Sequence, residues 1–187
     1  MCLLNPKWDC IGPGQRFEIF KLYVDFGAKM TYQTKYGWTP LHKACSRGLL
    51  NIVQEMLGRG ADVNMKTETC SPLVWAVFGK REAVVECLLQ HGAHADVISN
   101  NDPSSHVLFV AVLASFGKRD NRVELIRVLL RYGANREVLN GKNQTPLRYA
   151  IMLGGIDLVR VFVENGANLV PHPGRCKTAI ETAREFG

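Results

Sequence analysis

The chain of 187 residues lacks several features that would assign it to a broad class. No stretch approaches the roughly 18 consecutive apolar residues of a membrane-spanning helix, so we expect none. The N-terminal run MCLLNPKWDC has no basic segment followed by an uninterrupted apolar one, which argues against a secretory signal. The six cysteines form no CxxC pair and no metal-ligand spacing. These absences favour a reduced, intracellular protein, cytoplasmic or nuclear, without a metal.

Catalytic groups also lack a recognisable pattern. No nucleophile motif accompanies a histidine and a carboxylate, and paired carboxylates have no distinguishing context. His91 and His94 have a spacing that two metal ligands can share, but Gly92 ends a predicted helix between them and no third ligand is apparent. We therefore predict a protein that is not an enzyme, with no catalytic residue and no cofactor.

The tetrapeptide FGKR occurs twice, at 78–81 and 116–119. A phosphate-binding loop would need a preceding strand, several glycines and a lysine followed by serine or threonine, and none of these is present. We interpret both copies as solvated turns that recur because the fold recurs, with Lys80 and Arg81 facing solvent.

What the chain does contain is an internal repeat. Gly-Ala pairs begin at 27, 60, 92, 133 and 166, at intervals of 33, 32, 41 and 33 residues. Each pair follows an amphipathic run such as NIVQEMLGRGA or ELIRVLLRYGA, which predicts a helix ended by a left-handed glycine. A proline lies 20 residues before three of these glycines, at Pro40, Pro72 and Pro146, where a capping Thr or Ser precedes it and begins another helix.

The motif TPLHKA at 39–44, and the partial matches SPL at 71–73 and TPL at 145–147, resemble the ankyrin repeat. The resemblance implies an all-α solenoid of stacked helix pairs joined by β-hairpin fingers, and in His42 a structural hydrogen-bonding role. Over 1–187 we expect one ankyrin-repeat domain, a small ankyrin-only interaction protein. Its predicted parts are a degenerate repeat at 1–33, repeats at 34–65, 66–98, 99–139 and 140–171, and a partial repeat at 172–187.

The third of these repeats is eight residues too long, and its register stays open. Aligning the two FGKR copies places five extra residues before its first helix and three after, the split we favour. Aligning Ala111 with Ala76 gives two and six instead. At the ends, NPKWDC followed by a GPG turn is a faint first helix, and the last residues are a cap or the start of a longer array.

The resemblance implies that partner proteins contact the fingers and the ends of the first helices. Tyr36 and Trp38 are the strongest candidates because aromatic side chains dominate interface energetics, although Trp38 packing over the adjacent finger is an equal alternative. For Phe78 we favour sealing the groove between repeats over an exposed anchor. The predicted contacts are Lys35, Tyr36, Trp38, Ser46, Arg47, Thr67, Glu68, Cys70, Phe78, Asn101, Asp102, Ser104, Lys142, Gln144, Met152, Leu153, Arg175 and Lys177.

A rival interpretation comes from charge. The net charge is +6, and residues 118–148 hold eight Lys or Arg against three Asp or Glu. A ridge of Lys118, Arg119, Arg122, Arg127 and Arg131 would suit nucleic acid or anionic lipid, although charge on an outer helix usually serves solubility. Our prediction is a module that binds one or more proteins, acidic ones among them, as inhibitor, scaffold or adaptor.

Overall fold

The structure is a computed structural model that describes residues 10–67, 70–99, 105–115, 123–169 and 184. Those residues form nine α-helices and no β-sheet. They divide into two compact units, Met1–Ala93 and His94–Gly187, called unit 1 and unit 2 below. No helix within the described residues has the length and apolar character needed to cross a membrane.

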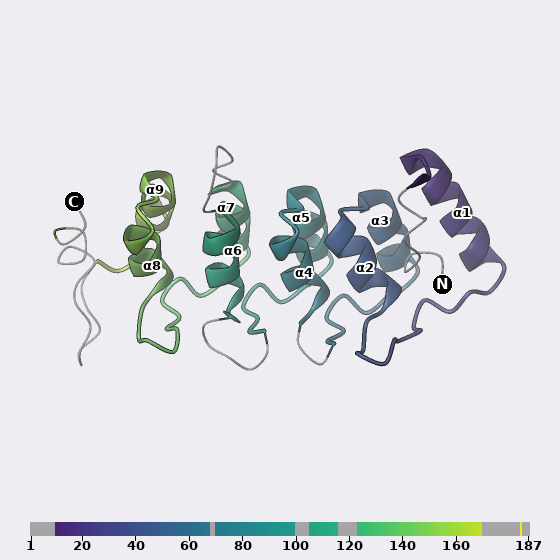
Figure 1. Ribbon diagram of the computed structural model, residues 1–187, viewed down its shortest axis with the longest axis horizontal. Helices are drawn as coiled ribbons and strands as arrows, with labels where there is room; N and C mark the ends of the chain where they lie inside the picture. The colour runs from purple at the N-terminus through teal and green to yellow at the C-terminus, as the bar shows by residue number, and fades with distance from the viewer. Residues whose placement is uncertain (1–9, 68–69, 100–104, 116–122, 170–183, 185–187) are drawn as a thin grey trace. The chain divides into compact units, whose positions relative to one another are not determined.

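Unit 1 begins with one long helix and continues with two helix pairs (Figure 1). Within each pair the first helix packs on the second, and like helices of the two pairs pack on one another, which gives a row of first helices and a row of second helices. The elements are α1 (Pro13–Asp25), the first helices α2 (Pro40–Arg47) and α4 (Pro72–Phe78), and the second helices α3 (Leu50–Gly58) and α5 (Glu82–Gln90).

Unit 2 repeats this arrangement with two further pairs. Its first helices are α6 (Val107–Ser115) and α8 (Pro146–Met152), which pack on each other. Its second helices are α7 (Val123–Arg131) and α9 (Ile156–Glu164), which also pack on each other. The stacked helix pairs confirm the predicted repeat architecture in each unit.

The first helices begin as the threonine–proline motif predicts. At α2 the Thr39 hydroxyl accepts from the His42 amide, His42 Nδ1 accepts from the Thr39 amide, and Pro40 occupies the first turn. Thr145 likewise accepts from the Arg148 amide at α8. Ser71 at α4 departs from the prediction, since its hydroxyl makes no capping bond and is buried without a hydrogen-bond partner.

Helix α1 and the four second helices are each followed by one of the five predicted glycines, all of which have left-handed backbones with φ between 74° and 88°. At α3 the Gly60 amide donates to Leu57 and the Ala61 amide donates to Met56. The same pair of bonds closes each of the other helices that precede a Gly-Ala pair. This is the Schellman arrangement, in which glycine is favoured because a Cβ disfavours positive φ.

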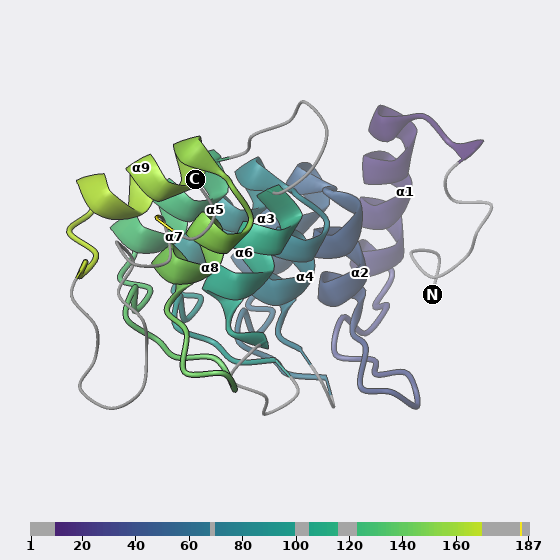
Figure 2. The same cartoon turned by 60° about the vertical axis from the view of Figure 1, so that its left-hand side comes forward.

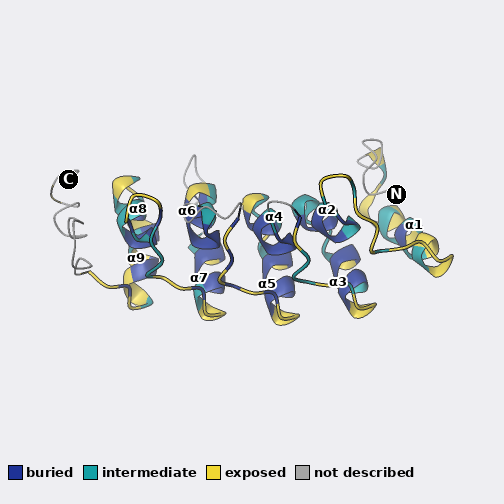
Figure 3. Cartoon of the chain, turned by 90° about the horizontal axis from the view of Figure 1, so that it is seen from below, coloured by how far each residue is buried: buried dark blue, intermediate teal, exposed yellow. Residues whose placement is uncertain are grey.

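The core lies between the two rows of helices in each unit (Figure 3). Its small members are the repeat alanines Ala44, Ala76, Ala111 and Ala150, all fully buried, which allow the helices of a pair to approach closely. Larger apolar side chains fill the remaining space, among them Ile52, Leu73, Leu88, Phe109, Leu125, Ile126, Leu147, Leu158 and Phe162.

Within each unit, the fingers that connect successive pairs lie at one end of the helices (Figure 2). They are short turns. One backbone hydrogen bond closes each of three fingers, between Thr34 and Trp38, Thr67 and Cys70, and Asn140 and Gln144. In the finger before α6, Ile98 and His106 form an isolated antiparallel bridge. Nearer the N-terminus, Pro13 starts α1, so the expected GPG turn is wrong.

The register that we favoured for the long third repeat is also wrong. Helix α6 begins at Val107, 35 residues after α4 begins at Pro72, and α7 begins 41 residues after α5. The surplus is therefore two residues before the first helix and six after it. The repeat alanine sets this register because only a small side chain fits between the paired helices, and Ala111 is fully buried like Ala76.

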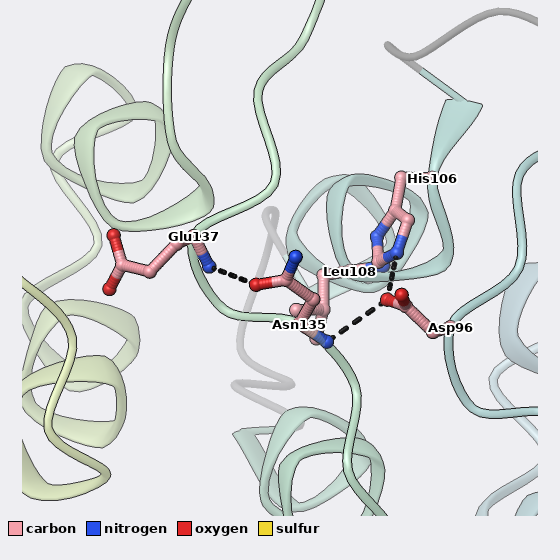
Figure 4. Close-up of polar contacts among 5 residues, drawn as sticks. All are labelled: Asp96, His106, Leu108, Asn135 and Glu137. Carbon is pink, nitrogen blue, oxygen red and sulfur yellow. Dashed lines mark hydrogen bonds and ion pairs between the residues drawn. The ribbon is translucent and has the colours of Figure 1, made fainter. Parts of the chain in front are cut away.

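In this register His106 stands where Thr39 stands in the earlier repeat, directly before the first helix. Its Nδ1 accepts a hydrogen bond from the Leu108 amide, and its Nε2 lies 2.7 Å from Oδ1 of Asp96. The same Asp96 oxygen accepts from the Asn135 amide at 3.0 Å (Figure 4). The His106 side chain is thus buried in the finger, with only 1% of it exposed.

Candidate protein-binding surface

Three aromatic side chains form a continuous row on the first-helix side of unit 1. The Trp38 ring, at the end of the finger, lies 4.3 Å from the Trp75 ring of α4, centroid to centroid. The Trp75 ring in turn meets the Phe78 ring edge to face at 6.1 Å. Trp38 and Trp75 are half-buried, whereas Phe78 is 68% exposed. We call Trp38, Trp75 and Phe78 the aromatic row.

The finger fixes the first member of the row. The Trp38 amide donates to the Thr34 hydroxyl at 3.1 Å, and the Thr34 amide donates to the Trp38 carbonyl at 2.9 Å. Of the two roles left open for Trp38, packing is the one that the structure shows. The neighbour that the structure shows is Trp75, in the first helix of the next repeat.

Two lysines lie over aromatic rings beside this row. At the finger tip, Lys35 Nζ is 4.8 Å from the centroid of the exposed Tyr36 ring. From α2, Lys43 Nζ is 5.8 Å from the Trp38 ring. Both distances are within the range of cation–π attraction. The surface therefore combines aromatic area with positive charge.

The predicted contacts at the end of α2 form part of a tight junction between repeats. Ser46 and Arg47 are half-buried, and the Ser46 carbonyl accepts from Nε of Arg81 at 3.3 Å. A Cβ added at Gly79 would lie 2.8 Å from that carbonyl oxygen, so only glycine allows this approach. In the first FGKR copy the glycine permits close packing and the arginine binds a helix-end carbonyl. Arg81 is exposed, as predicted, and its guanidinium in addition binds the Ser46 carbonyl.

The finger contacts predicted in the later repeats differ in exposure. Thr67 is buried and Cys70 is half-buried, and the Thr67 hydroxyl accepts from the Cys70 amide at 2.8 Å. Gln144 is also buried, with Nε2 at 3.1 Å from Sδ of Met152. These bonds hold the fingers together and leave little of Thr67 or Gln144 for a partner. The more accessible positions are Lys142 and Met152, with Leu153 half-buried.

Several predicted contacts lie outside the described residues, and so does the second FGKR copy. They are Glu68, Asn101, Asp102, Ser104, Arg175 and Lys177, together with Lys118, Arg119 and Arg122 of the basic ridge. Within the described part of that ridge, charges are paired. Arg127 lies 3.0 Å from Glu164, and Arg131 lies 3.8 Å from Glu124. The net positive charge of this region is therefore partly neutralised where the structure describes it.

Two residues of this surface, and one residue of unit 2 at a corresponding position, were missed in the sequence. Trp75 and Lys43 occupy the same position of successive first helices, four residues from the start, and they face the fingers. Leu113 occupies in α6 the position that Phe78 occupies in α4, and it is half-exposed. Each of the three lies one or two residues from the repeat alanine. An alignment of the repeats on that alanine would have found them.

Comparison with known proteins agrees with this architecture. Residues 10–101 match the family model described as ankyrin repeats, three copies. The chain is 47% identical over 141 residues to human Rabankyrin-5, an alignment that covers 75% of the chain and 11% of that protein. It is 31% identical over 134 residues to mouse Neurogenic locus notch homolog protein 1, covering 71% of the chain and 5% of that protein.

A further relative is the ankyrin repeat and KH domain-containing protein mask-1 of Caenorhabditis elegans. It is 29% identical over 153 residues, covering 79% of the chain and 6% of that protein. The chain thus spans a small part of the length of each relative. The repeated helix pairs, the glycine-closed helix ends and the matched family model lead to one conclusion. The chain belongs to the ankyrin-repeat family.

Proposed function

We propose that the chain is a non-enzymatic interaction module that binds a partner protein on the first-helix side of unit 1. Ankyrin repeats are general protein–protein interaction modules. The observation that carries the assignment to this surface is the aromatic row, which ends in a Phe78 ring that is two-thirds exposed. Large exposed aromatics beside cations are the usual composition of an interface hot spot.

The mechanism is steric. Trp75 holds the Phe78 ring from below through its edge-to-face contact, and Trp38 holds Trp75, so the surface exists before a partner arrives. A preformed surface loses little conformational entropy on binding. Occupying or presenting a partner in this way is the mode shared by inhibitors, scaffolds and adaptors. The helix pairs proposed for this role are α2 with α3 and α4 with α5.

The test compares the proteins retained by immobilised wild-type chain with those retained by Phe78→Ser. Because Phe78 is mostly exposed, the substitution should leave the unfolding midpoint near that of wild type. Ile156→Ser in α9 is the matched control, since Ile156 is 76% exposed and lies in unit 2. We expect a partner that wild type and the control retain and that Phe78→Ser loses. Equal retention by all three would exclude this surface.

A further inference from the structure

We infer that the segment received by unit 1 is acidic and carries an apolar side chain that packs on Phe78. This inference rests on the proposed function and names the chemistry of its partner. The supporting observations are the distribution of charge in unit 1, the position of two lysines beside the aromatic row, and the exposure of the row's last ring.

Charge in unit 1 is segregated between its two rows of helices. From Phe26 to Gln54 the sequence holds four cations and no acid, and α4 carries no charge at all. The acids of the second helices are Glu55 in α3 and Glu82 and Glu86 in α5, on the opposite row. A partner approaching α2 and the finger that precedes it therefore meets positive potential, which favours acidic chains. The four cations are Lys29, Lys35, Lys43 and Arg47.

Two of these cations are held where a bound chain would meet them. Lys35 extends over Tyr36 at the finger tip, and Lys43 extends over Trp38 from α2. Each ring restrains the lysine stem by contact with its ammonium group. A carboxylate can then pair with the ammonium from the solvent side, which makes a charge-assisted hydrogen bond with less ordering of the lysine.

The row itself supplies the apolar part of the site. Phe78 is exposed, its ring meets Trp75 edge to face, and the next residue, Gly79, adds no side chain beside it. A leucine-sized side chain that covers this ring would remove apolar area from water on both partners. The lysines and Phe78 together match an acidic segment that also carries an apolar residue.

The same composition of aromatics and cations can bind single-stranded nucleic acid, but the ring geometry argues against it. Base stacking needs open ring faces in succession. Here Trp38 packs against Trp75, and lysines lie over Trp38 and Tyr36. Phe78 is the ring of the row that is mostly exposed. Tyr36 is also exposed, but Lys35 lies over its ring, so the surface offers a poor path for successive bases and Phe78 an adequate wall for one side chain.

The experiment uses the full chain and three fluorescent probes in anisotropy titrations at low and physiological salt. The first probe is a peptide of alternating glutamate and leucine, the second replaces every glutamate by glutamine, and the third is oligouridylate. We expect the glutamate peptide to bind about tenfold more tightly than the glutamine peptide at low salt. The variant Lys43→Glu should weaken the glutamate peptide about tenfold and leave the glutamine peptide unaffected.

The matched control is Arg160→Glu, which makes the same change of net charge on an exposed side chain of α9 in unit 2. It should leave the affinity for the glutamate peptide near that of wild type. Equal loss in both variants would show a general charge effect and overturn the inference, as would tighter binding of oligouridylate than of the peptide. If the partner captured through Phe78 binds equally well to Lys43→Glu, the proposed function stands and the acidic partner is excluded.

Discussion

Asp96 contacts one nitrogen of the His106 imidazole while a backbone amide contacts the other, and together they fix the tautomer of the ring. His106 Nδ1 accepts from the Leu108 amide, so the ring proton is on Nε2, from which it is donated to Asp96 at 2.7 Å. The neutral ring thereby caps α6 and ties the finger to it. A second proton on Nδ1 would face an amide donor and end the cap.

This geometry predicts that stability falls in mild acid. Burial lowers the pKa of His106 below its ordinary value, an effect that hydrogen bonding and charge from Asp96 partly offset. Burial also lowers the pKa of His42 to about 4. The unfolded chain then binds more protons than the folded chain below about pH 6.5, so the free energy of unfolding decreases from that pH toward about pH 4. Urea denaturation at a series of pH values measures this slope.

The variant His106→Asn isolates the contribution of unit 2. Asparagine is a good N-cap and does not titrate, so it should keep most of the stability at neutral pH and flatten the slope. A slope unchanged from wild type would show that His106 titrates without consequence for folding.

Trp38 and Tyr36 should respond differently to truncation. Trp38→Ala removes the ring that packs on Trp75 and should destabilise the chain by about 2 kcal/mol. Tyr36 is 56% exposed, so Tyr36→Ala should change stability by less than about 0.5 kcal/mol. Thermal or urea unfolding checks both. A Trp38→Ala variant as stable as wild type would contradict the packing role of this ring.

Gly79 and Gly58 form a matched pair for the junction between repeats. The Cβ of Gly79→Ala would lie 2.8 Å from the Ser46 carbonyl oxygen, so this variant should lose about 1–3 kcal/mol. A Cβ at Gly58, at the end of α3, meets nothing within 4 Å, so Gly58→Ala should be neutral or gain up to about 1 kcal/mol. Similar losses at both positions would point to backbone effects unrelated to the Ser46 contact.

Thr39 and Ser71 each precede a first helix, but their hydroxyl groups should contribute differently to the free energy of unfolding. Thr39→Ala removes the hydroxyl that accepts from the His42 amide and should cost about 1 kcal/mol. Ser71→Ala removes a buried hydroxyl that has no hydrogen-bond partner, so it should be neutral or slightly stabilising. Denaturation midpoints of the two variants, measured side by side, decide the point, and a costly Ser71→Ala would contradict the difference in capping.

The sequence allowed most of the fold to be predicted where local chemistry determines backbone conformation. The glycines of the Gly-Ala pairs adopt left-handed conformations because the helix end requires them, and Pro40, Pro72 and Pro146 each begin a helix. The register of the third repeat was misjudged because FGKR marks a turn, and turns tolerate insertion. Ala111 was the better guide because packing in the core constrains it.

The surface was harder to predict for a related reason. Helix α4, PLVWAVF, is apolar on every side, so its sequence gives no polar face from which to orient Trp75. Its contact with Trp38 depends on how one repeat stacks on the next, which no local pattern encodes. The capping role of His106 was hidden similarly, because its partner Asp96 lies ten residues earlier in the finger.

The left-handed glycines have a practical consequence. Within the described residues, the second helices α3, α5, α7 and α9 have nine residues each, and each ends two residues before its own left-handed glycine. An added residue inside such a helix would displace that terminator, whereas the chain between Ser115 and Val123 already exceeds the corresponding link in the other repeats. We therefore expect an epitope tag inserted between those two residues to leave the ends of α6 and α7 in place more readily than one inserted within α7.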